Sequence, residues 1–423
     1  MPVPTMSPEE QLVRLTRGTV EVLPEPESLL ERLRQCAREG RALRVKQGFD
    51  PTAPDIHLGH TVGLRKLRQF QDLGHQVVLI VGDYTGMVGD PSGRNRTRPQ
   101  LAPEEIERNA RTYLEQFYRV LDPAPAAPRL PVEVHRNGEW FAPMGFMDVM
   151  RLGAEYTVAR ILERDDFAKR MRDQQPISLH ELFYPIMQGY DSVAIRADVE
   201  LGATEQKFNL LVGRALQETR GQVPQIAMTL PVLPGLDGVQ RMSKSLGNYI
   251  GVTDAPGDMF GKVMSLPDAA IATYWTLVTD AGDDELRAVE RDLADRAVNP
   301  MLVKKRLAGR VVRMYHGDEP AERAQRDFEA QFSRRETPEH LEEFGPRAVA
   351  EALGHAPNAG IVEVLVASGI AASKSGARRL VEQHAVSVDS VKVGGLDFAP
   401  DLARPFILRV GRQMRRFRPD GEG

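Results

Sequence analysis

The fold is decided by residues 43–82, which read LRVKQGFDPTAPDIHLGHTVGLRKLRQFQDLGHQVVLIVG. Leu43–Gln47 is a short β-like run that ends at a glycine, and Gln76–Val81 is a continuous apolar run that also ends at a glycine. Such runs are typical of buried parallel strands. Between them, Thr61–Leu73 has apolar residues at helical spacing. A strand, a helix and a strand in this order predict one βαβ unit with parallel neighbours.

The rest of the chain divides by pattern into further parts, and the fold class is α/β. Ile226–Leu233 is a later strand candidate, so we expect a Rossmann-like domain with a parallel sheet over 1–255. The pattern then turns helical, which predicts an α-helical domain over 256–335. A charged stretch with several Pro and Gly indicates a linker over 336–359. Two short helices and brief strand-like runs predict a small α+β domain over 360–420.

Composition limits the class of protein. The chain has 423 residues, of which 42% are hydrophobic and 27% charged, as in ordinary soluble globular proteins. One cysteine excludes an internal disulfide, a Cys-rich zinc site and an iron–sulfur cluster. No apolar run approaches the ~18 residues needed to span a bilayer, and residues 1–5 lack the features of a signal peptide. We therefore expect a reduced, cytoplasmic protein with no membrane partner.

Charge is unevenly distributed along the chain. Residues 361–418 hold ten Lys and Arg against five Asp and Glu, a balance of +5, whereas the whole chain carries −4. This distribution predicts that only the tail contacts a polyanion. In its second helix Lys374, Arg378 and Arg379 can share one face and bind RNA phosphates without reading sequence. A basic surface without a ligand is the alternative, and Arg164, in a mixed charge cluster, is expected at the surface.

The loop after the first strand carries two histidines in His57-Leu58-Gly59-His60. Three residues apart at the start of a helix, the histidines lie on one face, and Gly59 leaves the backbone open to close approach. A helix N-terminus with two imidazoles could hold a phosphoryl group as charge builds in a transition state. A helix cap with two partly buried histidines is the alternative interpretation.

A second motif is the glycine-bracketed loop 238–247, which reads GVQRMSKSLG. Its two cations, Arg241 and Lys244, could hold a polyphosphate, although a solvated basic loop has the same composition. The loop is not a P-loop. The chain also lacks Gly-x-Gly-x-x-Gly, which excludes the usual dinucleotide site.

Polar side chains recur at helical spacing in residues 184–191, which read YPIMQGYD. Tyr184, Gln188 and Asp191 fall at i, i+4 and i+7 and therefore share one helical face. A phenol, an amide and a carboxylate that converge on a pocket can bind a small polar zwitterion. The alternative is a polar face on a surface helix.

Together these motifs resemble those of the class I aminoacyl-tRNA synthetases, whose signatures HIGH and KMSKS correspond here to His57–His60 and Arg241–Ser245. The helix motif 184–191, the segment Gly82–Gly93 and the C-terminal domain are similar to those of bacterial tyrosyl-tRNA synthetases. The resemblance covers nearly the whole chain. It implies activation of L-tyrosine with ATP to tyrosyl-adenylate, and transfer of tyrosine to the 3′ end of tRNA(Tyr).

The resemblance implies a role for each matching residue. His57 and His60 would stabilise the transition state at the α-phosphate of ATP. Thr52 would reach the far phosphates, and Lys244 with Arg241 would clamp pyrophosphate on a mobile loop. The residues that would line ATP or the adenylate are Gly48, Asp50, Gly59, Gly202 and Glu205. The residues that would bind tyrosine are Asp90, Tyr184 and Gln188 at the ammonium group, Asp191 at the phenolic hydroxyl, and Gln206 near the substrate.

The resemblance also implies ATP as a substrate with Mg²⁺, no tightly bound cofactor, no dedicated metal site and a homodimer. The helical domain would contact the anticodon. Three alternatives stay open: a tryptophanyl enzyme, a non-catalytic RNA-binding protein on a synthetase scaffold, and a small-molecule adenylyltransferase. Asp191 and the tail argue against the first, and the intact motif residues His57, His60, Asp90 and Lys244 against the second. The tail and the helical domain argue against the third.

Three positions depart from the family pattern. Lys46 stands where many members carry a tyrosine that contacts the phenolic hydroxyl. Arg241 replaces the first lysine of KMSKS, and Glu205 replaces the more usual aspartate. Lys46 and Asp83 both lie at the carboxyl ends of strands that we expect to be neighbours. We therefore predict an ion pair between them beneath the tyrosine ring.

Overall fold

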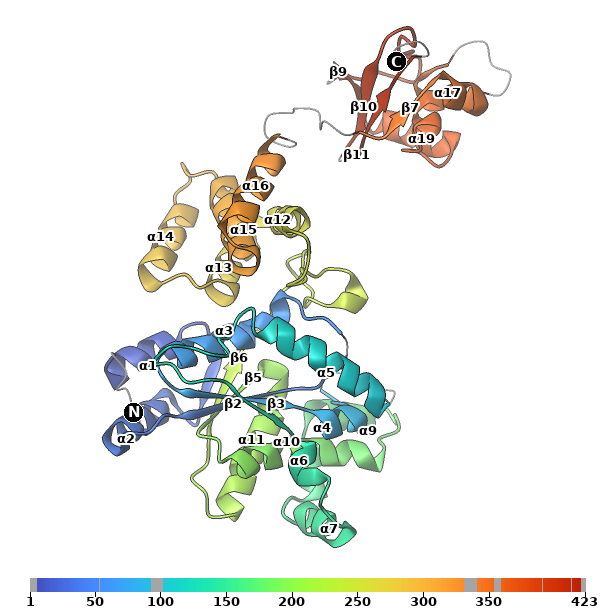
Figure 1. The fold of residues 1–423 in the computed structure, drawn as a ribbon. Coiled ribbons are helices and arrows are strands. Elements are labelled where there is room, and N and C mark those ends of the chain that lie inside the picture. Colours follow the sequence, from blue (N-terminus) through green and yellow to red (C-terminus); the bar gives the residue numbers. More distant parts are fainter. Residues whose placement is uncertain are drawn as a thin grey trace. The chain divides into compact units, whose positions relative to one another are not determined.

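The computed structural model describes residues 6–52, 54–92, 102–330, 341–353, 359–389, 391–411 and 413–419 of the chain. The chain folds into two compact units, Met1–Phe328 and Glu329–Gly423 (Figure 1). We call them the first and the second unit. Gly93, the last residue of the segment that carried part of the resemblance, lies outside the described residues.

A six-stranded sheet forms the centre of the first unit, in the order β1-β6-β5-β2-β3-β4. Its strands are β1 (Glu21–Leu23), β2 (Arg44–Phe49), β3 (Gln76–Val81), β4 (Glu133–Arg136), β5 (Val199–Ala203) and β6 (Ile226–Leu230). Neighbouring strands from β6 to β4 run parallel, and β1 runs antiparallel beside β6. The expected α/β class and the parallel pairing of the first βαβ unit are confirmed.

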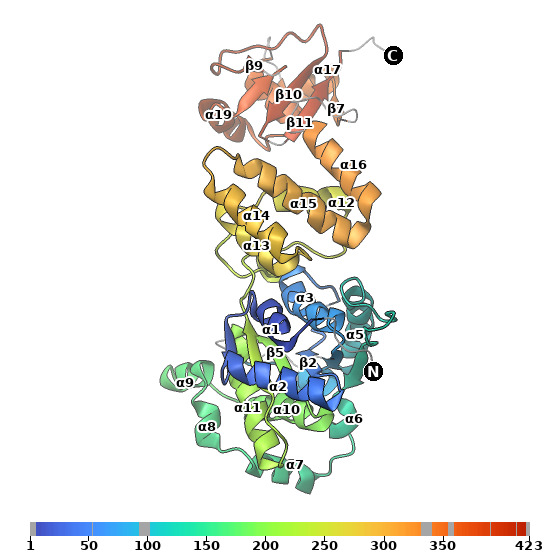
Figure 2. The same ribbon diagram turned by 90° about the vertical axis from the view of Figure 1, so that its left-hand side faces the viewer.

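Helices cover both faces of this sheet: α3 lies above its strands in Figures 1 and 2, and α10 and α11 lie below them. Alternate side chains of β3 serve the two faces, as a strand buried on both sides requires. Val77 and Leu79 belong to the large core shared with α3, whereas Val78 and Ile80 pack with Ile195 of α10. The helices of this part are α1 (Pro8–Thr16), α2 (Pro26–Glu39), α3 (Leu58–Asp72), α4 (Asp83–Val88), α5 (Pro103–Phe117), α6 (Gly138–Phe141), α7 (Phe146–Ala154), α8 (Val158–Leu162), α9 (Asp165–Arg172), α10 (Leu179–Ile195) and α11 (Lys207–Thr219).

The observed ends of the elements have local causes. α3 begins at Leu58, earlier than the expected Thr61, because His57 caps the helix with its ring nitrogen. β6 ends at Leu230, since the following Pro231 has no N–H for the strand ladder. The start of α3 and the end of β6 both lie at the carboxyl edge of the sheet, and each is fixed by the residue beside it.

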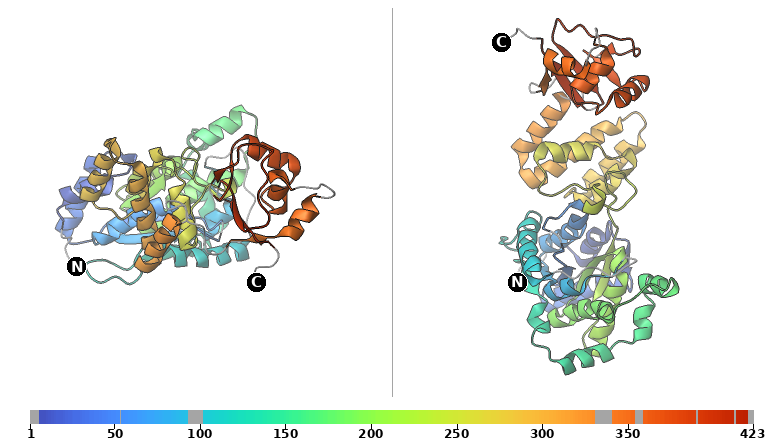
Figure 3. Two further views of the ribbon diagram at one scale, coloured as in Figure 1. Left: turned by 90° about the horizontal axis from the view of Figure 1, so that it is seen from above. Right: turned by 90° about the vertical axis from the view of Figure 1, so that its right-hand side faces the viewer.

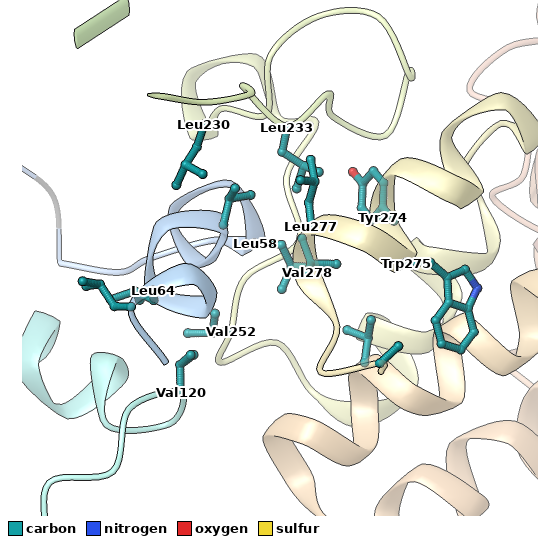
Figure 4. Packing of buried hydrophobic residues seen from close by; sticks show 14 of the residues in the cluster. Leu58, Leu64, Val120, Leu230, Leu233, Val252, Tyr274, Trp275, Leu277 and Val278 are labelled. Atoms are coloured by element: carbon teal, nitrogen blue, oxygen red, sulfur yellow. The ribbon is translucent and has the colours of Figure 1, made fainter. Parts of the chain in front are cut away.

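The helical pattern after residue 255 is confirmed, and these helices share a core with the α/β part. They are α12 (Pro256–Met264), α13 (Ile271–Val278), α14 (Asp283–Ala294), α15 (Pro300–His316) and α16 (Asp318–Phe328). Figure 4 shows Leu277 and Val278 of α13 beside Leu58 of α3, and all three belong to one apolar cluster. The Tyr274 hydroxyl also donates to the Pro234 carbonyl at 2.6 Å. The border expected between residues 255 and 256 therefore runs through a continuous core.

The second unit has a five-stranded sheet in the order β7-β11-β10-β8-β9, drawn in orange and red in Figure 3. Its core includes the wholly buried side chains of Ile361, Val364, Leu408 and Phe417. The α+β character expected from the sequence is present. The elements are β7 (Glu343–Phe344), α17 (Pro346–Leu353), α18 (Ile361–Ala367), α19 (Lys374–Glu382), β8 (Val386–Val388), β9 (Val391–Lys392), β10 (Phe406–Val410) and β11 (Gln413–Phe417).

The expected linker over 336–359 is wrong where the structure describes it, because β7 and α17 lie inside this range. Phe344 and Val349 are buried in the core of the second unit. β7 also pairs in parallel with β11. This stretch is rich in charged residues and prolines, but its apolar residues Phe344 and Val349 belong to the core of the second unit.

Candidate active site

A cavity of about 350 Å³ opens at the carboxyl ends of β2, β5 and β6. Its walls include Gly48 and Phe49 of β2, Leu201 and Gly202 of β5, and Leu230 of β6. β3 lies on one side of β2 and β5 lies on the other, so the winding of the chain reverses at β2. Ligands of open parallel sheets bind in the crevice at such a switch point.

Most of the predicted site residues line this one cavity. They come from the end of β2 and the loop after it, the start of α3, the loop after α4, the helix α10, and the end of β5 with the segment after it. They are Gly48, Asp50, Thr52, His57, Gly59, His60, Asp90, Tyr184, Gln188, Asp191, Gly202, Glu205 and Gln206. Arg241 and Lys244 lie outside its described lining. Lys374, Arg378 and Arg379 belong to the second unit.

His57 and His60 pack together at the start of α3, with ring centroids 4.0 Å apart. The Nδ1 of His57 accepts the Gly59 N–H at 3.1 Å, and the Nδ1 of His60 accepts the His57 N–H at 3.2 Å. Because both Nδ1 atoms accept, each neutral ring carries its proton on Nε2. Burial lowers the pKa of His57 to about 3 and that of His60 to about 4, and the charge of Lys244 acts in the same direction. Both rings are therefore neutral hydrogen-bond donors near pH 7.

The two signature motifs lie side by side although they are far apart in the sequence. The Leu58 N–H donates to the Ile250 carbonyl at 2.9 Å. A Cβ at Gly59 would lie 2.9 Å from the His57 ring and 3.6 Å from Cβ of Met242. Glycine at this position therefore keeps the space between the histidines and the loop 238–247 open.

Both cations of the loop 238–247 pair with carboxylates. The Arg241 Nη1 lies 3.2 Å from Oε1 of Glu205, and the Lys244 Nζ lies 3.4 Å from Oδ2 of Asp55. Exposed ion pairs such as these contribute little to stability, so a polyphosphate can replace the carboxylates at low cost. Arg241 and Glu205, two of the three departures from the family pattern, contact each other.

Asp90 lies in a chain of hydrogen bonds from amides. Its Oδ1 accepts from the Ser92 N–H at 2.8 Å, and its Oδ2 accepts from Nε2 of Gln206 at 2.7 Å. Nδ2 of Asn209 donates to Oε1 of Gln206 at 2.8 Å and to Oε1 of Gln188 at 2.9 Å. A carboxylate and two amide oxygens held in this way can accept from an ammonium group.

Tyr184 binds the loop after β2. Its hydroxyl donates to Oδ2 of Asp50 at 2.8 Å, and Oδ1 of Asp50 accepts from the Thr85 hydroxyl at 2.7 Å. The phenolic oxygen of Tyr184 keeps acceptor capacity while its proton is used. Tyr184 can therefore accept from a ligand and hold Asp50 at the same time.

Asp191 is a buried carboxylate, with 3% of its surface exposed. Its Oδ1 accepts from Nε1 of Trp140 at 3.0 Å. Burial raises the pKa of Asp191 to about 7, the nearby Lys46 charge and the hydrogen bonds from Trp140 and Asn137 lower it, and Glu200 raises it. A carboxylate in this setting gains from any further hydrogen-bond donor that a ligand brings.

The expected ion pair between Lys46 and Asp83 is wrong. Nζ of Lys46 pairs instead with Oε1 of Glu200 at 3.0 Å, and both side chains are wholly buried. Lys46 and Glu200 lie opposite each other on β2 and β5. Asp83 begins α4, where its Oδ1 accepts from the Gly138 N–H at 2.7 Å. The sequence indicated β3 as the neighbour of β2, whereas Lys46 finds its partner on β5, on the other side.

The predicted RNA-binding cations Lys374, Arg378 and Arg379 all lie exposed on α19 of the second unit. Ser373 caps this helix with its side chain. Nζ of Lys374 lies 3.3 Å from Oε1 of Glu363. Ala377 and Val381 of α19 pack on the core of the second unit, and the three cations are exposed to solvent.

Three residues that support the site were not predicted. Arg164, expected at the surface, is buried, with Nη1 at 3.2 Å from Oδ1 of Asn209 and Nη2 at 3.6 Å from Oδ1 of Asp90. Trp140 and Glu200 complete the set. A charged residue inside an apolar strand run, as Glu200 is, signals a buried partner. Trp140 and Arg164 carry no such signal in the sequence.

Among the described residues, no group of three or more His, Cys, Asp and Glu side chains is placed to hold a metal ion. In the same part of the chain, no helix is both long and apolar enough to cross a membrane. Cys36 is buried, and burial raises the pKa of its thiol to about 11, which makes it a poor nucleophile.

Comparison with known proteins agrees with this geometry. The family model of class I tRNA synthetases (W and Y) matches residues 38–333. A tyrosine–tRNA ligase of Carboxydothermus hydrogenoformans is 47% identical over 421 residues, which cover 99% of this chain and 98% of the relative. One of Symbiobacterium thermophilum is 51% identical over 411 residues, with 96% and 97% covered. A C-terminally truncated mitochondrial tyrosyl-tRNA synthetase of Aspergillus nidulans has a similar fold, with a TM-score of 0.64, 20% identity, and 77% and 94% of the two chains covered.

Proposed function

Because this chain belongs to the class I tRNA synthetases, in the family of the W and Y enzymes, we propose that it is a tyrosine–tRNA ligase. It joins L-tyrosine to ATP to form enzyme-bound tyrosyl-adenylate with release of pyrophosphate. It then passes the tyrosyl group to the 3′ end of tRNA(Tyr). The observation that carries this proposal is the buried carboxylate of Asp191 in the same cavity as His57 and His60.

Asp191 selects tyrosine by its hydroxyl. The phenol donates to this carboxylate, whereas phenylalanine leaves the carboxylate desolvated and without that donor. A site built to bind a hydroxyl rejects the analogue that lacks it, and the tyrosine enzymes of this family are the established example of that rule. No editing site is needed for such discrimination.

The ammonium group of tyrosine binds at the opposite polar side of the cavity. Asp90, Gln188 and Tyr184 accept from it, and Gln206 holds Asp90 in place through the 2.7 Å hydrogen bond. The geometry supports this assignment because the oxygens of these side chains are oriented by Asn209 and Ser92 rather than left to rotate.

In the activation step the tyrosine carboxylate attacks the α-phosphorus of ATP, and the bond to the β-phosphate breaks. The Nε2–H groups of His57 and His60 donate to the α-phosphate oxygens as charge builds. Thr52 reaches the phosphates of ATP that lie farthest from the adenosine. Lys244 and Arg241 release their carboxylate partners and bind pyrophosphate instead. Catalysis is positioning plus charge stabilisation, without a covalent bond to the enzyme.

The adenylate lies against backbone and short side chains. The residues assigned to it are Gly48, Asp50, Gly59, Gly202 and Glu205, the last at the ribose. Mg²⁺ arrives with ATP as part of the substrate, and its chemistry is to neutralise the phosphate charges. A tightly bound cofactor is not part of the proposal.

Transfer RNA is bound by the parts outside the cavity. Lys374, Arg378 and Arg379 on α19 contact its phosphates, and the helical region 256–335 contacts the anticodon. The exposed, solvent-facing position of the three cations supports the first assignment. Binding through phosphates positions the RNA without reading its sequence.

We further assign a homodimer and a cytoplasmic location. The helix α7 supports a contact with a second copy, because it exposes large apolar side chains: Phe146 is 77% exposed, Met147 59% and Met150 50%. Exposed apolar groups of this kind gather at protein interfaces more often than on free surfaces. The isolated chain leaves them uncovered.

The test is ATP–pyrophosphate exchange with each of the twenty amino acids, without tRNA. Exchange with tyrosine alone supports both the activation step and the role of Asp191. Exchange with tryptophan instead would keep the family and refute the role of Asp191. A folded protein that gives no exchange with any amino acid would favour a non-catalytic RNA-binding protein.

A further inference from the structure

Lys46 is absent from the described lining of the cavity, yet it is wholly buried and contacts Gln188, which belongs to that lining. Its Nζ donates to the backbone carbonyl of Gln188 at 2.9 Å and to the Ser192 hydroxyl at 2.8 Å. The third partner is Oε1 of Glu200 at 3.0 Å. An ammonium group has three N–H donors, so every one is used.

Glu200 is equally satisfied. Its Oε1 accepts from Lys46 and from Nε2 of Gln188, the latter at 3.1 Å. Its Oε2 accepts from the Ser192 hydroxyl at 3.0 Å and from Nε2 of Gln225. A carboxylate offers about four acceptor positions, and four donors occupy them. Because the Lys46 ammonium can only donate, it faces Glu200 as a carboxylate.

The ionised Glu200 decides which way the Gln188 amide is turned. A carboxylate can only accept, so the amide must present its NH₂ group to Glu200. Its Oε1 then accepts from Nδ2 of Asn209 at 2.9 Å and keeps a second lone pair. A protonated Glu200 could donate instead, and the amide could turn over and offer its NH₂ group to a ligand.

We propose that Lys46 is a positioning residue for the tyrosine ammonium group: it keeps Glu200 a carboxylate, and Glu200 fixes Gln188 with its oxygen as the acceptor. The inference deepens the proposed function and rests on the role that function gives to Gln188. Lys46 acts without touching the ligand. A buried ion pair of this kind adds little stability over apolar residues, but it imposes one arrangement on its neighbours.

The test compares three phenolic ligands by calorimetric titration without ATP. They are tyrosine, tyramine, and 3-(4-hydroxyphenyl)propionate, which lacks the ammonium group. The variants are Lys46→Met and the double variant Lys46→Met/Glu200→Leu. Both are expected to bind tyrosine and tyramine about tenfold or more weakly, the loss of a hydrogen bond to a charged group. The folded double variant should bind the propionate as tightly as the unmodified protein.

The double variant isolates the effect on the ammonium group. It removes two charges whose effects on Asp191 oppose each other, so recognition of the phenol is preserved. Apolar side chains in place of a buried ion pair usually keep the fold, whereas an unpaired buried charge does not. Thermal unfolding of each variant identifies any that fails to fold, and the folded double variant then decides.

Lys66→Met is the matched control. Lys66 is another buried lysine with three acceptors, the carbonyls of Leu15 and Arg17 and Oε1 of Gln69. Its loss is expected to lower stability and to leave the ratio of tyramine to propionate affinity unchanged.

Two outcomes in the folded double variant overturn the inference: equal weakening of all three ligands, or unchanged binding of tyramine. Neither touches the proposed function, which is judged separately by tyrosine-dependent exchange in the unmodified protein. Absence of that exchange overturns the proposed function itself.

Discussion

Nε1 of Trp140 donates to Oδ1 of Asp191 at 3.0 Å, and this bond joins α6 to the C-terminal half of α10. The indole has a single N–H, which is used here. The bond restrains the carboxylate that, in the proposed function, accepts from the phenol of the substrate. Under that proposal, selection of tyrosine also depends on Trp140, which does not belong to the described lining of the cavity.

Replacement of Trp140 by Phe is expected to raise the KM for tyrosine about tenfold, because Asp191 loses the donor that orients it. The kcat for pyrophosphate exchange should change little, and discrimination against phenylalanine should fall. Exchange kinetics with both amino acids measure this. Trp275→Phe is the control, since Trp275 is buried in α13 and its Nε1 has no partner among the described residues. An unchanged KM in Trp140→Phe would contradict the role of the bond.

The affinity for tyrosine is expected to fall as pH falls below about 7. The pKa of Asp191 is raised to about 7, so the ionised acceptor is present above that pH and is lost below it. His57 and His60, with pKa values of about 3 and 4, stay neutral throughout and cannot cause the change. A titration of tyrosine binding between about pH 5.5 and pH 8 measures it. A flat profile would refute the assignment, and Asp191→Asn should remove the dependence.

Asp191→Asn is expected to stabilise the protein at high pH while it weakens tyrosine binding. Folding raises the pKa of Asp191 from 3.8 to about 7, so the ionised form costs stability that is fully present above pH 7. The cost shrinks as pH falls towards 4. The Tm of the variant should therefore exceed that of the unmodified protein at pH 8, by a few degrees at most, and the gap should be narrower at pH 5. A lower Tm at pH 8 would contradict this.

Loss of an imidazole at the start of α3 is expected to slow activation without weakening tyrosine binding. His57→Asn keeps a helix cap but removes the Nε2–H donor, and kcat should fall about a hundredfold. His60→Asn should act similarly. His75→Asn is the control, because His75 is buried against Gln11, with its Nε2 at 2.9 Å from the Gln11 side chain, and lies outside the cavity lining. A kcat within a factor of about two of normal for His57→Asn would refute the donor role.

Charge reversal on α19 is expected to affect only the steps that involve tRNA. Arg378→Glu/Arg379→Glu should raise the KM for tRNA and reduce the salt dependence of binding, with pyrophosphate exchange unchanged. Aminoacylation at several salt concentrations measures this. Arg347→Glu, at an exposed position of α17 in the same unit, is the control for charge reversal elsewhere and is compared with each single variant, Arg378→Glu and Arg379→Glu. Equal effects of the control and the single variants would point to general charge rather than to the α19 surface.

Much of the fold was predictable because its pattern is local. Six consecutive apolar or amide-bearing residues, Gln76–Val81, form β3 as expected, and the helix before them follows from its spacing. The second unit's start was not predictable. Phe344 and Val349 belong to elements that contact β11 and α18, and both of these come later in the chain. The residues around them do not reveal these contacts.

The site was predictable where a motif carried it. His57, Asp90 and Asp191 converge because the motif residues follow parallel strands or share a helical face. The partner of Lys46 could not be predicted, because it depends on which strand lies beside β2. Only the order of the sheet places Glu200 there, and a single sequence does not contain that order.

The short strand β1 has a consequence for aggregation. It pairs Glu21–Leu23 with Ala227–Thr229 of β6. Without it, β6 would be an outer strand with a row of open backbone donors and acceptors and an apolar surface, the kind of edge on which foreign strands assemble. β1 therefore replaces β6 at the edge of the sheet with a strand of only 3 residues, and so short an edge hinders the addition of strands from neighbouring molecules.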